Sequence, residues 1–165
     1  MKEKEISIKI RECSPEELTP DRQALIKAAK EATRNSLAPY SNFHVGAAIE
    51  MADGEIFTGA NQENAAFMAG TCAERSACFY AGANRPGAPF KRIAIAAWHD
   101  PEEKCGDDYE AGFQADPISP CGLCRQALLE YEHLHGPIEV LLYGRDKTYV
   151  IDSVSDLMPL SFTEF

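Results

Sequence analysis

Three cysteines and one glutamate are the residues of this 165-residue chain whose types and spacing are best suited to chemistry. Cys72 and Glu74 stand in the segment TCAERSA, and Cys121 and Cys124 stand in the segment SPCGLCRQ. Three thiolates can hold Zn²⁺, and a nearby carboxylate can carry the proton of a water that the metal makes acidic. The pattern therefore predicts a zinc-activated water with its own proton carrier.

The same two segments indicate how the charge of three thiolates is balanced. Ser119, followed by a proline, is typical of a helix N-cap, so Cys121 is expected at a positive helix end. Thr71 is a similar N-cap candidate for a helix that carries Cys72. Arg75 follows that cysteine by three residues and is predicted to reach a thiolate sulfur. Without this compensation, three thiolates would weaken the Lewis acidity of the metal.

Cys-x-x-Cys alone is most often a structural zinc site or a redox pair, so these alternatives stay open. A structural site needs a fourth protein ligand, and Cys72 has no cysteine or histidine three residues away. Cys105 is the candidate that would close the site. A thioredoxin-like pair at Cys121 leaves Glu74 and Cys72 unexplained. The three-ligand count favours a catalytic site with a fourth position for water.

The other cysteines and the histidines have simpler interpretations. Cys13, Cys78 and Cys105 are predicted to be free thiols. The four histidines are interpreted as surface or core residues with no role at the metal; they are His44, His99, His133 and His135.

Composition limits the partners and the location of the chain. A formal net charge of −10 opposes binding to nucleic acid or an anionic membrane, because phosphate contacts need lysine and arginine. The N-terminal MKEKEISIKI lacks an apolar export signal, and no apolar run is long enough to span a membrane. We therefore expect a cytoplasmic protein with reduced thiols. At 45% hydrophobic content, residues 1–165 are expected to form one domain.

Apolar periodicity and turn residues predict alternating strands and helices. Strands are predicted over 5–10, 44–51, 55–61, 91–98, 137–143 and 148–151. Helices are predicted from Ser14 or Thr19 to about Asn35, and over 71–82, 121–133 and 154–158. Residues 99–118 are polar and are expected to form a long surface loop. The fold class is therefore α/β, a three-layer α/β/α sandwich around a mixed sheet of about five strands.

Five colinear segments resemble the cytidine deaminase family, in the homotetrameric branch whose first zinc ligand is cysteine. The segments are APYSNFHVGAAI, TGANQENAAF, TCAERSA, SPCGLCRQ and, more weakly, LMPLSF. A cysteine or histidine, a glutamate two residues later and a distant Pro-Cys-x-x-Cys are a known signature of zinc deaminases. The resemblance implies that Cys72, Cys121 and Cys124 bind one Zn²⁺ per chain and that Glu74 shuttles protons.

The resemblance also implies a set of substrate contacts. Asn61 and Glu63 match the pair that binds the ribose 3′-hydroxyl, and Phe43 matches a ring against the nucleoside. The main chain at Ala73 and Ser119 matches positions that meet the pyrimidine edge. Phe162 matches an aromatic residue that reaches a neighbouring subunit's site, which implies a homotetramer. Each has a purely structural alternative: a core aromatic for Phe43, a turn for Asn61, solvation for Glu63 and a tail anchor for Phe162.

The chain departs from the family pattern at three places. The segment between Trp98 and Ser119 is longer than the family leads us to expect, so it is interpreted as a lid or a subunit contact. Gln62 replaces a small apolar residue, and Phe67 stands where tyrosine is common. These changes put local packing and one hydroxyl contact in doubt.

The function that the resemblance implies is hydrolytic deamination of cytidine and 2′-deoxycytidine to uridine and 2′-deoxyuridine plus ammonia, as in pyrimidine salvage. A blasticidin-type aminonucleoside deaminase uses the same zinc residues and is the enzymatic alternative. A non-catalytic, zinc-stabilised interaction domain is the alternative of another class. It leaves Glu74 without a purpose, because a structural zinc needs no free carboxylate.

Overall fold

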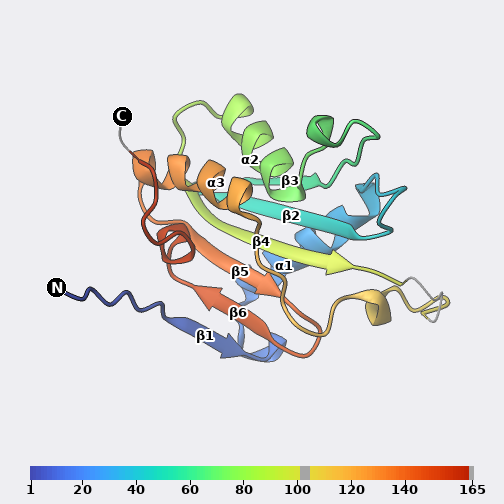
Figure 1. Cartoon of the computed structure of the whole chain (residues 1–165). Helices are drawn as coiled ribbons and strands as arrows, with labels where there is room; N and C mark the ends of the chain where they lie inside the picture. Colours follow the sequence, from blue (N-terminus) through green and yellow to red (C-terminus); the bar gives the residue numbers. More distant parts are fainter. Residues whose placement is uncertain (101–104, 164–165) are drawn as a thin grey trace.

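A six-stranded mixed sheet forms the centre of the molecule, which we describe from a computed structural model at residues 1–100 and 105–163. The strand order is β1-β6-β5-β4-β2-β3 (Figure 1). Only β4 and β5 are parallel among the paired strands. The strands are β1 (Ile10–Cys13), β2 (His44–Met51), β3 (Ile56–Ala60), β4 (Phe90–Trp98), β5 (Glu139–Tyr143) and β6 (Thr148–Ile151).

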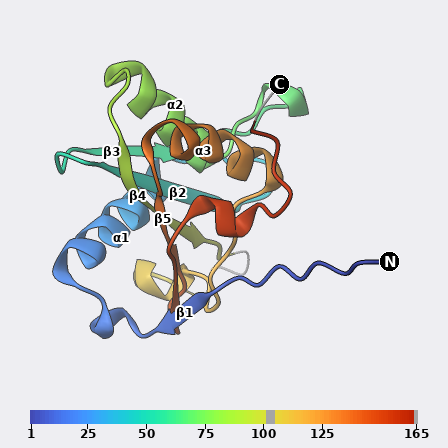
Figure 2. The same ribbon diagram turned by 90° about the vertical axis from the view of Figure 1, so that its left-hand side faces the viewer.

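Helices cover both faces of the sheet and complete the predicted three layers. Helix α1 (Pro20–Ala32) lies on one face, and α2 (Ala73–Asn84) and α3 (Gly122–His135) lie on the other (Figure 2). Each face has its own apolar core, with Leu25 among the buried residues of the α1 side and Leu128 among those of the α2–α3 side. The short 3-10 helices are η1 (Pro15–Glu17), η2 (Thr33–Asn35), η3 (Phe67–Ala69), η4 (Tyr109–Gly112) and η5 (Val154–Leu157). None of the described helices is long and apolar enough to cross a membrane.

Two glycines let the helices approach the β2–β3 hairpin closely. A Cβ atom at Gly46 would lie 2.1 Å from the Ala29 carbonyl oxygen of α1. A Cβ atom at Gly59 would lie 2.3 Å from the Ala77 nitrogen of α2. Because real Cβ atoms do not come this close to backbone, only glycine permits both contacts. The contact at Gly59 thereby sets the distance between α2 and the sheet. Cys72 is the N-cap of this helix and Glu74 lies in its first turn.

The N-terminal strand differs from the prediction. The alternating isoleucines predict a strand over residues 5–10, but β1 starts at Ile10, and Ile6 and Ile8 are exposed. The reason is the length of the neighbouring strand, since Ile10 already faces Ile151 at the end of β6. The alternating pattern of residues 5–10 is therefore present without a partner strand within the described chain.

The segment predicted to be a long surface loop, residues 99–118, also differs from the prediction. Its residues 101–104 lie outside the described chain. Its second half folds back on the sheet, where Phe113 is buried on the α1 side and forms an isolated bridge with Trp98. Tyr109 stacks on Trp98 with ring centroids 5.0 Å apart, and its hydroxyl lies 2.6 Å from Thr33 Oγ1. These aromatic contacts outweigh the polar composition of the loop, because each buries a large apolar surface.

A buried carboxylate joins α3 to the end of the chain. Glu132 accepts hydrogen bonds from the backbone N–H groups of Ile138, Val154 and Ser155 at 2.8–2.9 Å and from the hydroxyl of Ser153 at 2.6 Å. Its desolvation is thus offset by four donors. The contact holds the start of β5 and the η5 turn against the helix that follows Cys121.

Candidate zinc centre and active site

Both cysteine-bearing segments place a thiol at the start of a helix, as predicted, although the cap residues differ. Cys72 is the N-cap of α2 and Cys121 is the N-cap of α3, both with extended backbone. Thr71 and Ser119, the predicted caps, lie one and two residues earlier. The Ser119 hydroxyl instead accepts a hydrogen bond from Arg125 at 2.9 Å. The sulfurs consequently lie nearer the positive helix ends than the sequence indicated.

The three sulfurs form a compact cluster. The Sγ atoms of Cys72 and Cys121 are 3.9 Å apart, and those of Cys121 and Cys124 are 3.5 Å apart. All three lie within 4.8 Å of one another. A tetrahedral zinc with Zn–S bonds of about 2.3 Å needs sulfurs about 3.8 Å apart, so the thiols fit this ion. Within the described residues no other group of three potential ligands occurs, and neither Cys105 nor a histidine joins this one. Cys72, Cys121 and Cys124 hold one zinc ion per chain.

Hydrogen bonding couples the three thiols, and Cys121 Sγ donates to Cys124 Sγ. The Cys124 thiol hydrogen-bonds Cys72 and, with help from Cys121 and Arg75, lowers the pKa of Cys72 to about 5 against the opposing effect of burial. The same bond and burial raise the pKa of Cys124. Zinc binds cysteine as the thiolate, so metal binding releases the protons of the cluster. The pKa of the isolated Cys78 thiol, by contrast, is raised by burial to about 12, as befits an inert core residue.

Arg75 contacts the cluster as its position predicts. Burial opposes its charge, but its interactions with the thiols of Cys72 and Cys124 outweigh burial and raise the pKa of the guanidinium. Its buried Nε–H makes no hydrogen bond to the described residues. The guanidinium therefore adds a fixed positive charge where three thiolates would otherwise give the zinc centre a net charge of −1.

Glu74 lies in the first turn of α2 and is almost fully buried, with 4% of its surface exposed. Burial raises the pKa of its carboxyl, and the negative charge at Cys72 raises it further. The carboxyl also interacts with the Cys124 thiol. A carboxyl whose pKa is raised in this way holds a proton more readily than an exposed glutamate, which suits a general acid–base.

Arg125 is a residue of the site that sequence reasoning missed. Its guanidinium donates to the carbonyl oxygens of Pro120 at 2.7 Å and Leu157 at 2.8 Å, besides the hydroxyl of Ser119. Arg125 thereby links the loop before Cys121 to the η5 turn. This loop includes the Ser119 main chain, which is expected to meet the pyrimidine. The sequence did hold one indication of this role. Arg125 follows Cys124 in the first turn of the helix, where an arginine can reach back to the preceding loop.

The Asn61 side chain organises the loop before β2. Its Oδ1 accepts hydrogen bonds from the Ser36 hydroxyl at 2.5 Å and the Val45 N–H at 2.8 Å, and its Nδ2 donates to the Phe43 carbonyl at 2.9 Å. These bonds fit the structural alternative, in which Asn61 closes a turn. They do not exclude a substrate contact, because the amide has a second N–H to donate.

Glu63 performs a related task on the same loop before β2. Its Oε2 accepts from the backbone N–H groups of Tyr40 at 2.9 Å and Ser41 at 3.2 Å. The Ser41 hydroxyl is the main cause that lowers the pKa of this carboxyl, followed by the Tyr40 N–H. The group is therefore an ionised acceptor, and a carboxylate has lone pairs beyond those used here.

The Phe43 ring is partly buried and packs beside a residue that the sequence had not connected with it. Its centroid lies 5.4 Å from that of His99, which follows β4 at the start of the long loop. Sequence spacing could not show this contact, because 56 positions separate the two residues. The loop thus begins against the ring that is expected to meet the nucleoside.

The tail carries Phe162 along α3. Its carbonyl accepts a hydrogen bond from Gln126 Nε2 at 2.8 Å, while its surface remains 65% exposed. Ala73 is buried at the first position of α2, directly after Cys72.

Comparison with known proteins agrees with this centre. The family model for the "Cytidine and deoxycytidylate deaminase zinc-binding region" matches residues 19–135. A cytidine deaminase of Halalkalibacterium halodurans is 37% identical over 87% of this chain and 95% of its own length, and one of Sporosarcina psychrophila is 35% identical over 87% and 93%. The crystal structure of a Burkholderia pseudomallei cytidine deaminase is 40% identical with a TM-score of 0.69, covering 88% of this chain and all of that one. With its three zinc-binding cysteines in the matched region and Glu74 beside them, the chain belongs to the cytidine deaminase family of zinc-dependent hydrolases.

Proposed function

We propose that the protein hydrolyses cytidine and 2′-deoxycytidine to uridine and 2′-deoxyuridine with release of ammonia. The observation that carries this proposal is the buried carboxyl of Glu74 in the helical turn that follows one of three clustered thiols. Zinc, when bound, supplies the Lewis acidity that lets a water lose its proton near neutral pH. We further propose that residues 1–165 act as one catalytic domain in cytoplasmic pyrimidine salvage.

In this mechanism Glu74 carries every proton. It accepts a proton from the water that adds to C4 of the cytosine ring and delivers it to N3. It then takes the proton of the new C4 hydroxyl and delivers it to the departing amino nitrogen. The C4–N bond breaks, ammonia leaves and the C4 carbonyl forms. Arg125 holds the Ser119 main chain in place for the pyrimidine edge, and Ala73 offers its backbone on the other side.

Ribose recognition is assigned to Asn61 and Glu63. Both have hydrogen-bonding capacity beyond their contacts within the chain, and both hydrogen-bond to the loop before β2, which contains Phe43. A site built to hydrogen-bond a substrate hydroxyl discriminates against an analogue that lacks it, which penalises substrates without the sugar.

This recognition predicts strong discrimination against the free base. We expect kcat/KM for cytosine to be roughly 10⁴-fold below that for cytidine, because the free base forgoes the ribose hydrogen bonds assigned to Asn61 and Glu63. 2′-Deoxycytidine, which keeps its 3′-hydroxyl, is the matched control and should react at a rate close to that of cytidine. Steady-state assays of cytidine, 2′-deoxycytidine, cytosine and blasticidin test the proposal. A better kcat/KM for cytosine contradicts ribose recognition, and one for blasticidin favours the alternative deaminase.

A homotetramer is the proposed assembly. Its support is the exposure of large apolar side chains around the site, a pattern typical of subunit interfaces. They are Phe67, Met68, Phe79, Tyr80, Leu123, Leu160 and Phe162. We assign Phe162 to a neighbour's active site. Light scattering should give the mass of four chains, and a monomer with full activity contradicts this assembly.

A further inference from the structure

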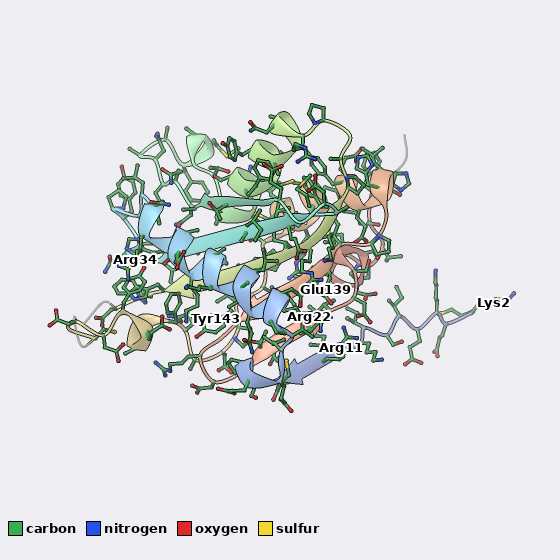
Figure 3. The ribbon with its side chains drawn as sticks, turned by 180° about the vertical axis from the view of Figure 1, so that it is seen from behind. Lys2, Arg11, Arg22, Arg34, Glu139 and Tyr143 are labelled. Atoms are coloured by element: carbon green, nitrogen blue, oxygen red, sulfur yellow. The ribbon has the colours of Figure 1, made fainter. Side chains whose placement is uncertain are left out.

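The N-terminal residues form an arm that leaves the body of the protein. The arm comprises residues 1–9, and β1 continues it from Ile10 along the edge of the sheet. Figures 1 and 2 show the arm projecting alone, and Figure 3 shows Lys2 far from Arg11, where the chain joins the body. Ile6, Ile8 and Ile10 are 49%, 42% and 49% exposed. Three alternating isoleucines are thus left uncovered on an extended segment.

The isoleucine row belongs to one face of an incomplete sheet. Ile10 is directly opposite Ile151, whose side chain is buried in the core on the α3 side. Because side chains alternate along a strand, Ile6 and Ile8 extend that same face beyond the body. β1 pairs with β6 on one side only, so its outer edge offers free backbone groups to another strand.

We propose that this arm pairs antiparallel with the same arm of a second copy, with a two-fold axis at Ile8. In this register, Ile8 of one copy lies opposite Ile8 of the other. Ile6 of each copy lies opposite Ile10 of the other. The six isoleucines form one covered row, and the outer edge of β1 gains a partner strand. The contact is isologous and closes on two copies.

The charges of the segment agree with this register. Glu5 falls opposite Arg11 and Lys4 falls opposite Glu12, so each unlike pair occurs twice. Arg11 already forms a bidentate ion pair with Asp152, and its half-exposed side chain can receive a second carboxylate. In the first pair the acid, Glu5, lies on the arm and the base, Arg11, lies on β1. In the second pair the base, Lys4, lies on the arm and the acid, Glu12, lies on β1.

Other registers are less favourable. A two-fold antiparallel pair must place one residue at its axis, since opposite residues share a face. Lys9 at the axis faces another lysine, and Ser7 at the axis places Ile10 opposite Lys4. Ile6 at the axis places Ile8 opposite Lys4. Ile8 alone pairs every isoleucine with an isoleucine and opposes no like charges.

Self-cross-linking tests the register in the full-length, zinc-loaded protein. Ile8→Cys should form a covalent dimer under mild oxidation, because the paired Cα atoms lie about 4.5–5.5 Å apart, within disulfide range. Lys4→Cys is the matched control on the same arm and face, where the two thiols lie about 27 Å apart along the strands. We expect about tenfold more dimer from Ile8→Cys on non-reducing gels, with the disulfide between the two introduced thiols identified by peptide mass spectrometry. Equal yields from the two variants, or no dimer above the wild-type level from Ile8→Cys, overturn the proposal.

Charge reversal provides an independent test. Lys4→Glu in the Ile8→Cys background should lower the yield of dimer, since it faces Glu12, and the further change Glu12→Lys should restore it. The register is overturned if Lys4→Glu leaves the dimer yield unchanged, or if Glu12→Lys does not restore it. These measurements read only the contact between arms, so they are independent of deaminase activity and of the proposed tetramer.

Discussion

Glu74→Gln should abolish most of the turnover while the protein keeps its zinc. One carboxylate carries each proton in the proposed mechanism, so kcat for cytidine should fall by at least the 10²- to 10⁴-fold typical of lost general acid–base catalysis. Glutamine preserves the shape of this buried side chain, which has 4% of its surface exposed. The loss should therefore appear in kcat, measured from the absorbance change on deamination, and not in folding.

Two controls make this result specific. Zinc analysis should still find one ion per chain, because Glu74 is not a member of the sulfur cluster. Glu130→Gln removes the same charge from an exposed position of α3 and should leave turnover unchanged. Near-normal turnover by Glu74→Gln with zinc bound would falsify its assignment as the proton carrier. That outcome would also remove the main argument against a purely structural zinc.

Cys121→Ala should lose both zinc and stability. A two-cysteine remnant cannot hold the ion as three do, and a ligand that binds only the folded state contributes about 4 kcal/mol when its free concentration is 1,000 times its Kd. Cys121 is exposed, so the packing that alanine removes is small. The free energy of unfolding should accordingly fall by several kcal/mol, measured by denaturant titration, with zinc content near zero.

Cys78→Ala separates metal loss from packing loss. Cys78 is fully buried on the same helix as Glu74 but lies outside the sulfur cluster. Its replacement removes core packing, at a cost of about 1 kcal/mol for a small side chain. It should nevertheless retain one zinc per chain. If Cys121→Ala also retained one zinc per chain, the ligand set would be wrong.

The long loop shows why composition alone misjudged part of the fold. Its polar residues predicted exposure, yet Phe113 is buried and Tyr109 stacks on Trp98. A few aromatic residues decide where such a segment packs, because their buried area outweighs that of many polar neighbours. Its first described residue, His99, also approaches Phe43. The polar composition of the loop gave no sign of this contact.

Local patterns in the sequence determined the elements and the chemical groups of this protein. Helix α1, the β2–β3 hairpin and β6 follow from periodicity and turn residues within a few positions, and the spacing of the cysteines and Glu74 indicated an open zinc site. Only the tertiary structure decided contacts between distant residues. The sulfurs of Cys72 and Cys121 meet across 49 positions because α2 and α3 begin at the same end of one sheet face. No local propensity encodes that meeting, since it depends on strand order and on helix packing against the sheet.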